Sequence, residues 1–402
     1  MNTHGSPGGC PVSHLHVERS TLSESFVPVG QSDPYLHVRE VHQIKEVLSD
    51  PEAFLPDNAL RAVTSFEPAT LRVLARYGFA LPEVLASATG QLHRDVRAEV
   101  ARFFTPPKVR RQEDLVRTLT RNFLDTAPRT GTFDPDLPVF HTVTVALMAC
   151  LTGLDRADFL AVGLTEEELA QASLDSLELF WGWPDPQRQE ELAHRAGRFY
   201  RRLRQLVENA ADNPDVLYTR LLRRGIDKRR VISLAYFLVI AGQFTTALLQ
   251  KNVLYSVLTG SHGIDLADCV DSEQANSAVR AVLATDSSVP TWRRIAGANA
   301  SLGGEPVAPG TEILLELSTR RGCEQGSFSL AFGWGIHRCL GAYLAESETT
   351  WVIHEIALWA RENRVNLRLE NEPRWIDLLS YRAPEPLRIG LYPSPQPVNE
   401  TP

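Results

Sequence analysis

The stretch from Phe328 to Glu348 reads FSLAFGWGIHRCLGAYLAESE and holds one cysteine, Cys339, in an unusual setting. Two glycines, Gly333 and Gly335, alternate with aromatic residues before it, and an Ala- and Leu-rich run that predicts a helix follows it. Glycines permit a tight turn whose backbone N–H groups face the sulfur, and a helix N-terminus stabilises a thiolate. The stretch therefore predicts a reactive or metal-binding thiolate; the alternative is a buried structural cysteine in a glycine-rich turn.

This loop resembles the heme-binding loop of the cytochrome P450 family, whose pattern is Phe-x-x-Gly-x-His/Arg-x-Cys-x-Gly. Every fixed position is filled, by Phe332, Gly335, His337, Cys339 and Gly341. The resemblance implies that Cys339 is the axial thiolate ligand of heme b (iron protoporphyrin IX), because cytochromes P450 hold heme iron by a cysteine thiolate. It also implies that Phe332, Gly333 and Gly341 contact the cofactor.

The resemblance extends over about residues 26–392 and implies a fold. We expect a mainly α protein with small β-sheets (α+β), the cytochrome P450 fold, with heme between a long central helix and the cysteine loop. A single heme domain is predicted at 26–395, between a flexible lead-in at 1–25 and a tail at 396–402. Length alone would suggest two or three domains for 402 residues, of which 43% are hydrophobic.

The amino-acid composition limits the classes of binding partner and the cellular compartment that we expect. The net charge of −8 argues against nucleic acid, and no run approaches the apolar length of a transmembrane helix. The N-terminus lacks the basic start and apolar stretch of a signal peptide. The five cysteines form no CxxC pair, which is typical of a reducing cytoplasm. Cys10, His14 and His16 could ligate a metal, but without a nearby fourth ligand a flexible tail is favoured. We expect a cytoplasmic protein with no membrane or nucleic-acid partner.

The residues from Arg229 to Thr259 form the longest helical pattern, apolar all round at its centre as in a helix that crosses a domain core. Within it, residues 241–246 read AGQFTT, which resembles the family's oxygen-activating motif Ala-Gly-x-Asp/Glu-Thr-Thr. The resemblance implies that Ala241 and Gly242 let heme approach the backbone. It implies that Thr245 hydrogen-bonds dioxygen or a water beside it. The alternative is a glycine and two threonines tolerated in a core helix.

Four basic residues match those with which the family holds the heme propionates. His93 and Arg97 lie four apart on one side of the amphipathic helix predicted at 91–104. Arg294 lies in a segment that resembles the family's propionate-binding strand, and His337 precedes the ligand cysteine. For His93 and Arg97, a solvated basic helix face is the alternative.

Three departures set the chain apart from the family pattern. Phe244 stands where the family carries the acid that relays protons, and phenylalanine carries no proton. Ala281 and Ala284 occupy the places of the Glu-x-x-Arg pair. In the family, this buried ion pair forms a triad with an arginine from the segment just before the heme loop. Here that segment, between Ile313 and Phe328, is largely deleted. Replacing a whole buried charge network with small apolar residues can be neutral, whereas removing one partner costs about 3–5 kcal/mol. The losses are therefore mutually consistent.

Three functions are compatible with these features. The first is a heme-thiolate monooxygenase with altered proton delivery, acting on a small molecule or carrier-bound intermediate in bacterial secondary metabolism, with electrons from a ferredoxin and its reductase. The second is a peroxide-driven or redox-neutral heme enzyme, such as a dehydratase or isomerase. The third is a non-catalytic helper that activates a partner such as a glycosyltransferase. A basic surface for an acidic ferredoxin is expected at Arg94, Arg102, Lys108, Arg110, Arg111 and Arg338.

Overall fold

The computed structural model describes residues 16–19, 22, 26–127, 131–210, 212–318 and 327–393. Helices make up most of it. The α-helices are α1 (Val41–Ser49), α2 (Pro68–Arg76), α3 (Gly90–Ala101), α4 (Pro106–Arg110), α5 (Glu113–Thr126), α6 (Thr142–Thr152), α7 (Arg156–Ala161), α8 (Glu166–Trp181), α9 (Pro186–Asn209), α10 (Leu217–Arg223), α11 (Lys228–Leu238), α12 (Thr245–Thr259), α13 (Ser272–Thr285) and α14 (Ala342–Glu362). Two π-helical turns, η3 (Asp136–His141) and η4 (Val239–Phe244), and three 3₁₀ turns, η5 (Asp268–Val270), η6 (Ser327–Phe332) and η7 (Gly335–His337), join them.

The strands form small sheets. Their bounds are β1 (His16–Val17), β2 (Leu36–Val38), β3 (Phe54–Leu55), β4 (Thr132–Phe133), β5 (Thr291–Ala296), β6 (Ser301–Leu302), β7 (Glu305–Pro306), β8 (Glu312–Glu316), β9 (Val365–Leu369), β10 (Arg374–Ile376), β11 (Pro384–Glu385) and β12 (Ile389–Pro393). The largest has the order β2-β8-β5-β3, with β2 parallel to β8 and the other pairs antiparallel. The smaller ones are β1-β10-β11, β4-β12-β9 and the hairpin β6-β7. The expected mainly α fold with small sheets is confirmed.

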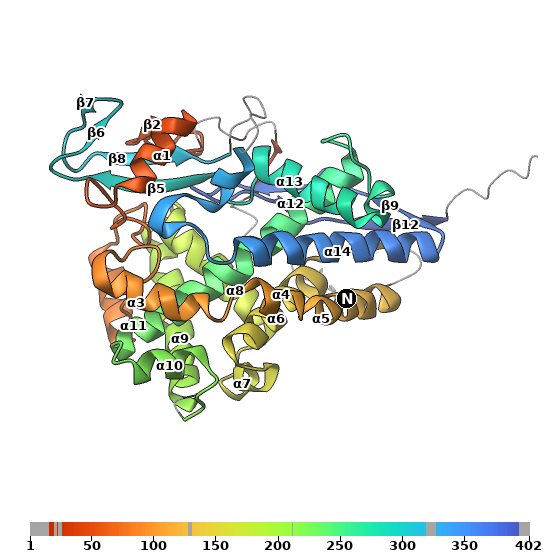
Figure 1. Cartoon of the computed structure of the whole chain (residues 1–402), viewed down its shortest axis with the longest axis horizontal. Helices are drawn as coiled ribbons and strands as arrows, with labels where there is room; N and C mark the ends of the chain where they lie inside the picture. Colours follow the sequence, from red (N-terminus) through yellow and green to blue (C-terminus); the bar gives the residue numbers. More distant parts are fainter. Residues whose placement is uncertain are drawn as a thin grey trace, which may run out of the picture.

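Helix α14 runs from the centre of the molecule toward one end, with other helices on both sides of it (Figure 1). One side of α14 contacts α5, and the other contacts α12 and α13. The largest sheet lies at one end of the molecule together with α1, and the helices from α3 to α11 lie across α14 from it (Figure 1). The cysteine loop leads directly into α14, so the packing of α14 positions that loop.

A continuous helix of 32 residues, Lys228–Thr259, runs through the core as α11, η4 and α12. By length and apolar composition it could cross a membrane, so the expectation that no run in the sequence approaches this length was wrong. Its most apolar window is 78% buried inside the protein, as in a core helix. The π-helical turn η4 interrupts it directly before Thr245. Such turns often mark functional sites because they change which side chains share a face.

Some local predictions differ from the structure. Val27–Gly30 was expected to be a strand, but it forms a bend and a turn. The helix predicted at 91–104 ends at Ala101, and the two prolines after it begin α4 instead of ending α3. Proline is favourable at the first helical position, because the N–H it lacks has no partner there. At Thr165, by contrast, the predicted N-cap is present as a capping box that starts α8.

A few predictions lie outside the described residues. Cys10 and His14 of the candidate metal motif fall there, and so does most of the lead-in at 1–25. Residues 319–326, within the shortened segment before the cysteine loop, and the tail at 396–402 also fall outside. The proposed domain boundaries therefore remain predictions.

Candidate functional site

Cys339 lies in the loop between η7 and α14, three residues before the helix begins. Its backbone N–H donates to the carbonyl of Phe332 at 2.8 Å, which closes the loop. Gly335 has a φ of +68°, and a Cβ there would collide with the backbone carbonyl of Leu48. Only glycine satisfies both conditions at this position. The glycine in the sequence motif is thus required by the turn and by the close approach of α1.

The sulfur of Cys339 is exposed toward an internal cavity and otherwise surrounded by protein. Burial raises the pKa of the thiol, while a backbone hydrogen bond from Gly341 and the charges of Arg97 and Arg338 lower it. The three opposing contributions favour the thiolate but do not outweigh burial, so the pKa of the thiol stays raised. A bound metal cation would deprotonate the thiol, because a coordinating thiol is deprotonated outright.

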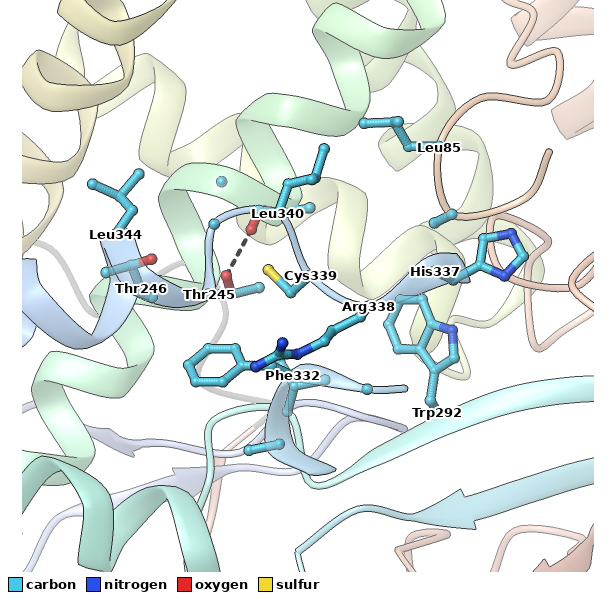
Figure 2. A pocket seen from close by; sticks show the side chains of 18 of the residues that line it. Leu85, Thr245, Thr246, Trp292, Phe332, His337, Arg338, Cys339, Leu340 and Leu344 are labelled. Carbon is cyan, nitrogen blue, oxygen red and sulfur yellow. Dashed lines mark hydrogen bonds between the residues drawn. The ribbon is translucent and has the colours of Figure 1, made fainter. Parts of the chain in front are cut away.

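The cavity beside Cys339 has a volume of about 230 Å³. Its walls come from the cysteine loop, the long core helix and β5 with the segment before it, which places Thr245 and Cys339 in one space (Figure 2). Trp292 and Phe332 also line it. The structure therefore brings the two sequence motifs, which are almost 100 residues apart in the chain, to the same cavity.

Ala241, Gly242 and Thr245 all line the cavity, as the sequence motif predicts. The Thr245 hydroxyl donates to the Ala241 carbonyl at 2.8 Å. The hydroxyl proton of Thr245 is thus used in a hydrogen bond to the helix backbone, and the lone pairs of the hydroxyl oxygen remain able to accept a hydrogen bond. At Gly242, a Cβ would lie 2.6 Å from the terminal methyl of Met148. Gly242 therefore makes room for a side chain of α6 as well as lining the cavity.

Phe244, predicted as part of the catalytic motif, does not line the cavity. It is 1% exposed, and its ring packs 5.4 Å from that of His141. It ends the π-helical turn η4, in which the five-residue hydrogen-bond spacing replaces the four-residue spacing of an α-helix. The position of the family's acid thus faces His141 at the end of η3, and the side chain at this position does not border the cavity.

The basic residues predicted to hold the propionates gather at one side of the site. Arg97, Arg294 and His337 line the cavity. His93 does not line it, but its ring lies 4.9 Å from that of His337. Arg97 donates to the Arg338 carbonyl at 2.7 Å. All four predicted residues are therefore brought together, three of them at the cavity wall.

This basic group meets backbone carbonyls but no carboxylate at the cavity wall, and part of its hydrogen-bonding capacity is unused. Burial lowers the pKa of Arg294 to about 10 and that of His337 to about 4, and it lowers the pKa of His93 as well. One nitrogen on each of the three is buried without a partner: His93 Nε2, Arg294 Nε and His337 Nδ1. Among the described residues that line the cavity there is no Asp or Glu. Unpartnered buried donors and uncompensated positive charge are costly, so the site fits a cofactor that brings carboxylates.

Sequence reasoning did not identify several cavity residues. Met148, Ser288 and Tyr381 line it from segments with no motif, and Ser288 donates to the Thr245 carbonyl at 2.9 Å. Their contribution depends on the packing of elements that are distant in sequence. A second, smaller cavity of about 20 Å³ adjoins the first at Trp292 and Tyr381 and has almost entirely apolar walls.

Comparison with known proteins agrees with this site. No model of a known protein family matches the chain. The erythromycin C-12 hydroxylase of Saccharopolyspora erythraea is 26% identical over 303 residues, which cover 70% of this chain and 73% of that protein. Cytochrome P450 109 of Bacillus spizizenii is 24% identical, over 64% of this chain and 67% of that protein.

Solved structures show the same fold. Cytochrome P450 CREJ in complex with (4-ethylphenyl) dihydrogen phosphate matches with a TM-score of 0.79 at 22% identity, over 92% of this chain and 94% of that chain. The heme domain of Acinetobacter radioresistens CYP116B5 also reaches 0.79, at 21% identity over 92% of both chains. The chain thus has the fold of cytochromes P450, and the curated proteins to which its sequence is similar are cytochromes P450 and a hydroxylase.

Proposed function

We propose that the chain is an atypical cytochrome P450 monooxygenase that binds heme b and oxidises a small molecule or a carrier-bound intermediate. The observation that carries this proposal is the cavity that joins the Cys339 sulfur, Thr245 and a basic group without counter-charge. Cys339 would hold the iron, and His93, Arg97, Arg294 and His337 would hold the propionates. When bound, thiolate-ligated heme supplies oxygen activation, with the thiolate favouring O–O cleavage.

Thr245 is the cavity residue best placed to handle protons. Because its hydroxyl donates to the Ala241 carbonyl, it would accept a hydrogen bond from a water in the cavity and hold that water in place. No carboxylic acid lines the cavity among the described residues, so proton delivery would depend on such waters or on a group of the substrate. This differs from the family pattern, in which an acid beside the threonine performs the relay.

The absent acid also favours the second candidate, a peroxide-driven or redox-neutral heme enzyme. Hydrogen peroxide already carries the protons that reduction of dioxygen requires, so such an enzyme has no need of an acid at position 244. The third candidate, a helper without heme, is disfavoured because it has no need of Cys339 facing a cavity or of buried basic nitrogens without partners beside it.

A role in bacterial secondary metabolism is part of the proposal. It is supported by the similarity to an erythromycin C-12 hydroxylase. A carrier-bound substrate remains within the proposal because P450BioI, a structural neighbour with a TM-score of 0.73, was solved with an acyl carrier protein that carries a fatty acid. The proposal also includes a cytoplasmic location, and a ferredoxin with its reductase as the electron donors.

Turnover with two oxidant systems separates the first two candidates. The purified holoprotein is assayed for dealkylation of the fluorogenic probe 7-ethoxycoumarin, with NADPH, ferredoxin and ferredoxin reductase in one arm and hydrogen peroxide in the other. The monooxygenase proposal predicts product in the reductase arm. Product in the peroxide arm alone would replace it with the peroxide-driven candidate.

A further inference from the structure

Helix α13 carries the positions at which the family's Glu-x-x-Arg pair is replaced by Ala281 and Ala284. It packs against α14, against α12 and against η6, which leads into the cysteine loop. Since α14 begins three residues after Cys339, any shift of α13 relative to α14 is passed to the loop. The two alanines offer no polar group to fix that relation, so other residues must do so.

A polar network joins α13 to the first half of α14. Arg280 Nε donates to Glu346 Oε1 at 2.7 Å, and Asn276 Nδ2 donates to the same oxygen at 3.1 Å. Asn276 Nδ2 also lies 3.2 Å from Thr350 Oγ1. Both pairs of residues are spaced by four, so two successive turns of one helix hold two successive turns of the other. This network, the α13–α14 clamp, therefore fixes both the rotation and the sliding of the helices.

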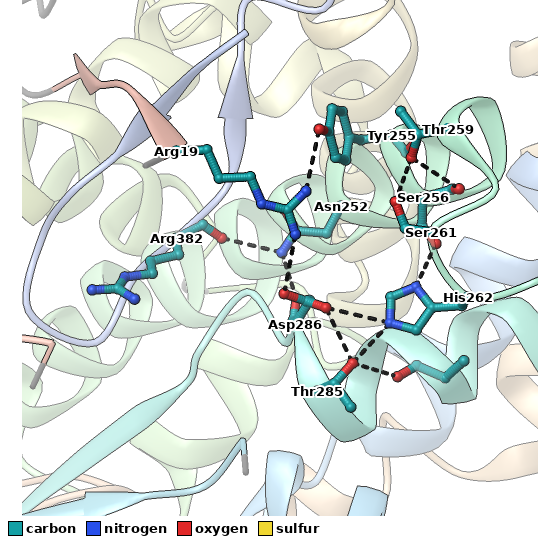
Figure 3. Close-up of polar contacts among 11 residues, drawn as sticks. Arg19, Asn252, Tyr255, Ser256, Thr259, Ser261, His262, Thr285, Asp286 and Arg382 are labelled. Carbon is teal, nitrogen blue, oxygen red and sulfur yellow. Dashed lines mark hydrogen bonds and ion pairs between the residues drawn. The ribbon is translucent and has the colours of Figure 1, made fainter. Parts of the chain in front are cut away.

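A second network holds the far end of α13 to α12 (Figure 3). His262 follows the end of α12; its Nδ1 lies 2.7 Å from Ser256 Oγ and its Nε2 lies 2.8 Å from Thr285 Oγ1. Asn252 Nδ2 donates to the carbonyl of Asp286 at 2.8 Å. Thus α13 is fixed to the helix that begins with Thr245, and the clamp links α13 to α14, which also packs against α5 and α12 and begins three residues after Cys339.

We propose that Asn276, Arg280 and Glu346 position the Cys339 loop in place of the missing Glu-x-x-Arg pair. This inference rests on the proposed heme-thiolate function. None of these three residues lines the cavity, so they are positioning residues. Glu346 is only 18% exposed and Arg280 is 53% exposed. Such a half-exposed pair adds little to global stability, so its effect is expected in the geometry of the ligand cysteine.

The test uses the holoprotein and the spectrum of its reduced carbon monoxide complex, which reports whether the axial ligand is thiolate. Glu346→Ala removes the acceptor of both donors, and the thiolate form should convert to the thiol form about tenfold faster on mild warming. Glu346→Gln keeps an acceptor oxygen and should restore most of the wild-type behaviour. Glu362→Ala is the matched control, because Glu362 is also on α14 and pairs with Arg121 outside the clamp.

The outcomes distinguish this inference from the proposed function. If the wild type shows the thiolate spectrum and Glu346→Ala converts no faster than Glu362→Ala, the clamp does not position the loop. If Glu346→Gln is as impaired as Glu346→Ala, the hydrogen bonds are not what matters, and the inference also fails. If the wild type itself lacks the thiolate spectrum, the proposed function fails and the clamp loses its role with it.

Discussion

Gly335 and Gly333 have almost the same backbone conformation in the cysteine loop but differ in their surroundings. Their φ angles are +68° and +69°. A Cβ on Gly335 would collide with the Leu48 carbonyl, whereas a Cβ on Gly333 would meet nothing within 4 Å. The pair therefore separates the cost of the left-handed conformation from the cost of a collision with the backbone.

Gly333→Ala should lower the free energy of unfolding by about 1–2 kcal/mol, the cost of a left-handed non-glycine residue. Gly335→Ala should cost about 3 kcal/mol or more and should reduce heme retention, because the loop must also move away from α1. Urea denaturation and the heme absorbance per protein measure the two effects. Equal losses in both variants would show that the contact with Leu48 is not tight.

At the level of single residues the sequence predicted much of the site, because the cysteine loop is a local pattern. The glycine-rich turn before Cys339 indicated a thiolate, and the resemblance to the family's loop implied a heme ligand. The structure places Cys339 at a cavity with the predicted basic residues. The direction of Phe244 could not be predicted in this way. It depends on the π-helical turn η4, and an ordinary helical period would have placed residue 244 on the face of Ala241.

Among the helices, the contact between α12 and α14 contains a buried acid. Glu348 is fully buried, and Gln250 Nε2 donates to its Oε1 at 3.0 Å. Burial raises the pKa of Glu348 from 4.5 to about 8. The folded protein therefore keeps this carboxyl protonated at pH values where the unfolded chain has released the proton.

The sign of the pH dependence follows from this difference. The stability that the neutral acid contributes is fully present below pH 4.5 and is lost as the pH rises through about 8, because the folded state binds more protons in that window. Glu348→Gln keeps an acceptor for Gln250 and cannot ionise. The free energy of unfolding of the wild type should fall by a few kcal/mol relative to the variant between these pH values. Parallel pH profiles in chemical denaturation would contradict the account.

Contacts between elements are also where sequence reasoning was least informative. The α13–α14 clamp joins Arg280 to Glu346 across 66 positions, and neither residue belongs to a recognisable motif. The sequence did show that the Glu-x-x-Arg pair is missing and that the loss is consistent with a shortened segment before the loop. It could not show what stands in its place, because that depends on how two helices pack.

For the whole molecule, the basic group at the cavity links heme binding to the stability of the fold. A ligand that binds only the folded state stabilises it in proportion to its affinity, so the holoprotein should unfold at a higher temperature than the apoprotein. Arg97 and Arg294 come from α3 and β5, two elements that both contribute to the cavity wall. A cofactor held by both would therefore connect the helical part to the largest sheet.

Arg294→Ala should speed heme loss to an apomyoglobin acceptor by at least about tenfold, since a hydrogen bond to a charged group contributes about 1.5–3 kcal/mol. Adding Arg97→Ala should speed it further and narrow the melting difference between holo- and apoprotein. Arg94→Ala is the control, because Arg94 is exposed on α3 and bonds only Gln91 among the contacts described. Heme loss from the double variant at the rate of this control would show that these residues do not hold the cofactor.

The assignment of Cys339 as heme ligand is the central claim. Its most direct test is the absorption spectrum of the purified protein after reduction and addition of carbon monoxide, for the wild type and for Cys339→Ala. The account predicts a Soret band that shifts to the thiolate position in the wild type and the absence of that shifted band in the variant. A colourless wild type, or an unchanged thiolate spectrum in Cys339→Ala, would contradict it.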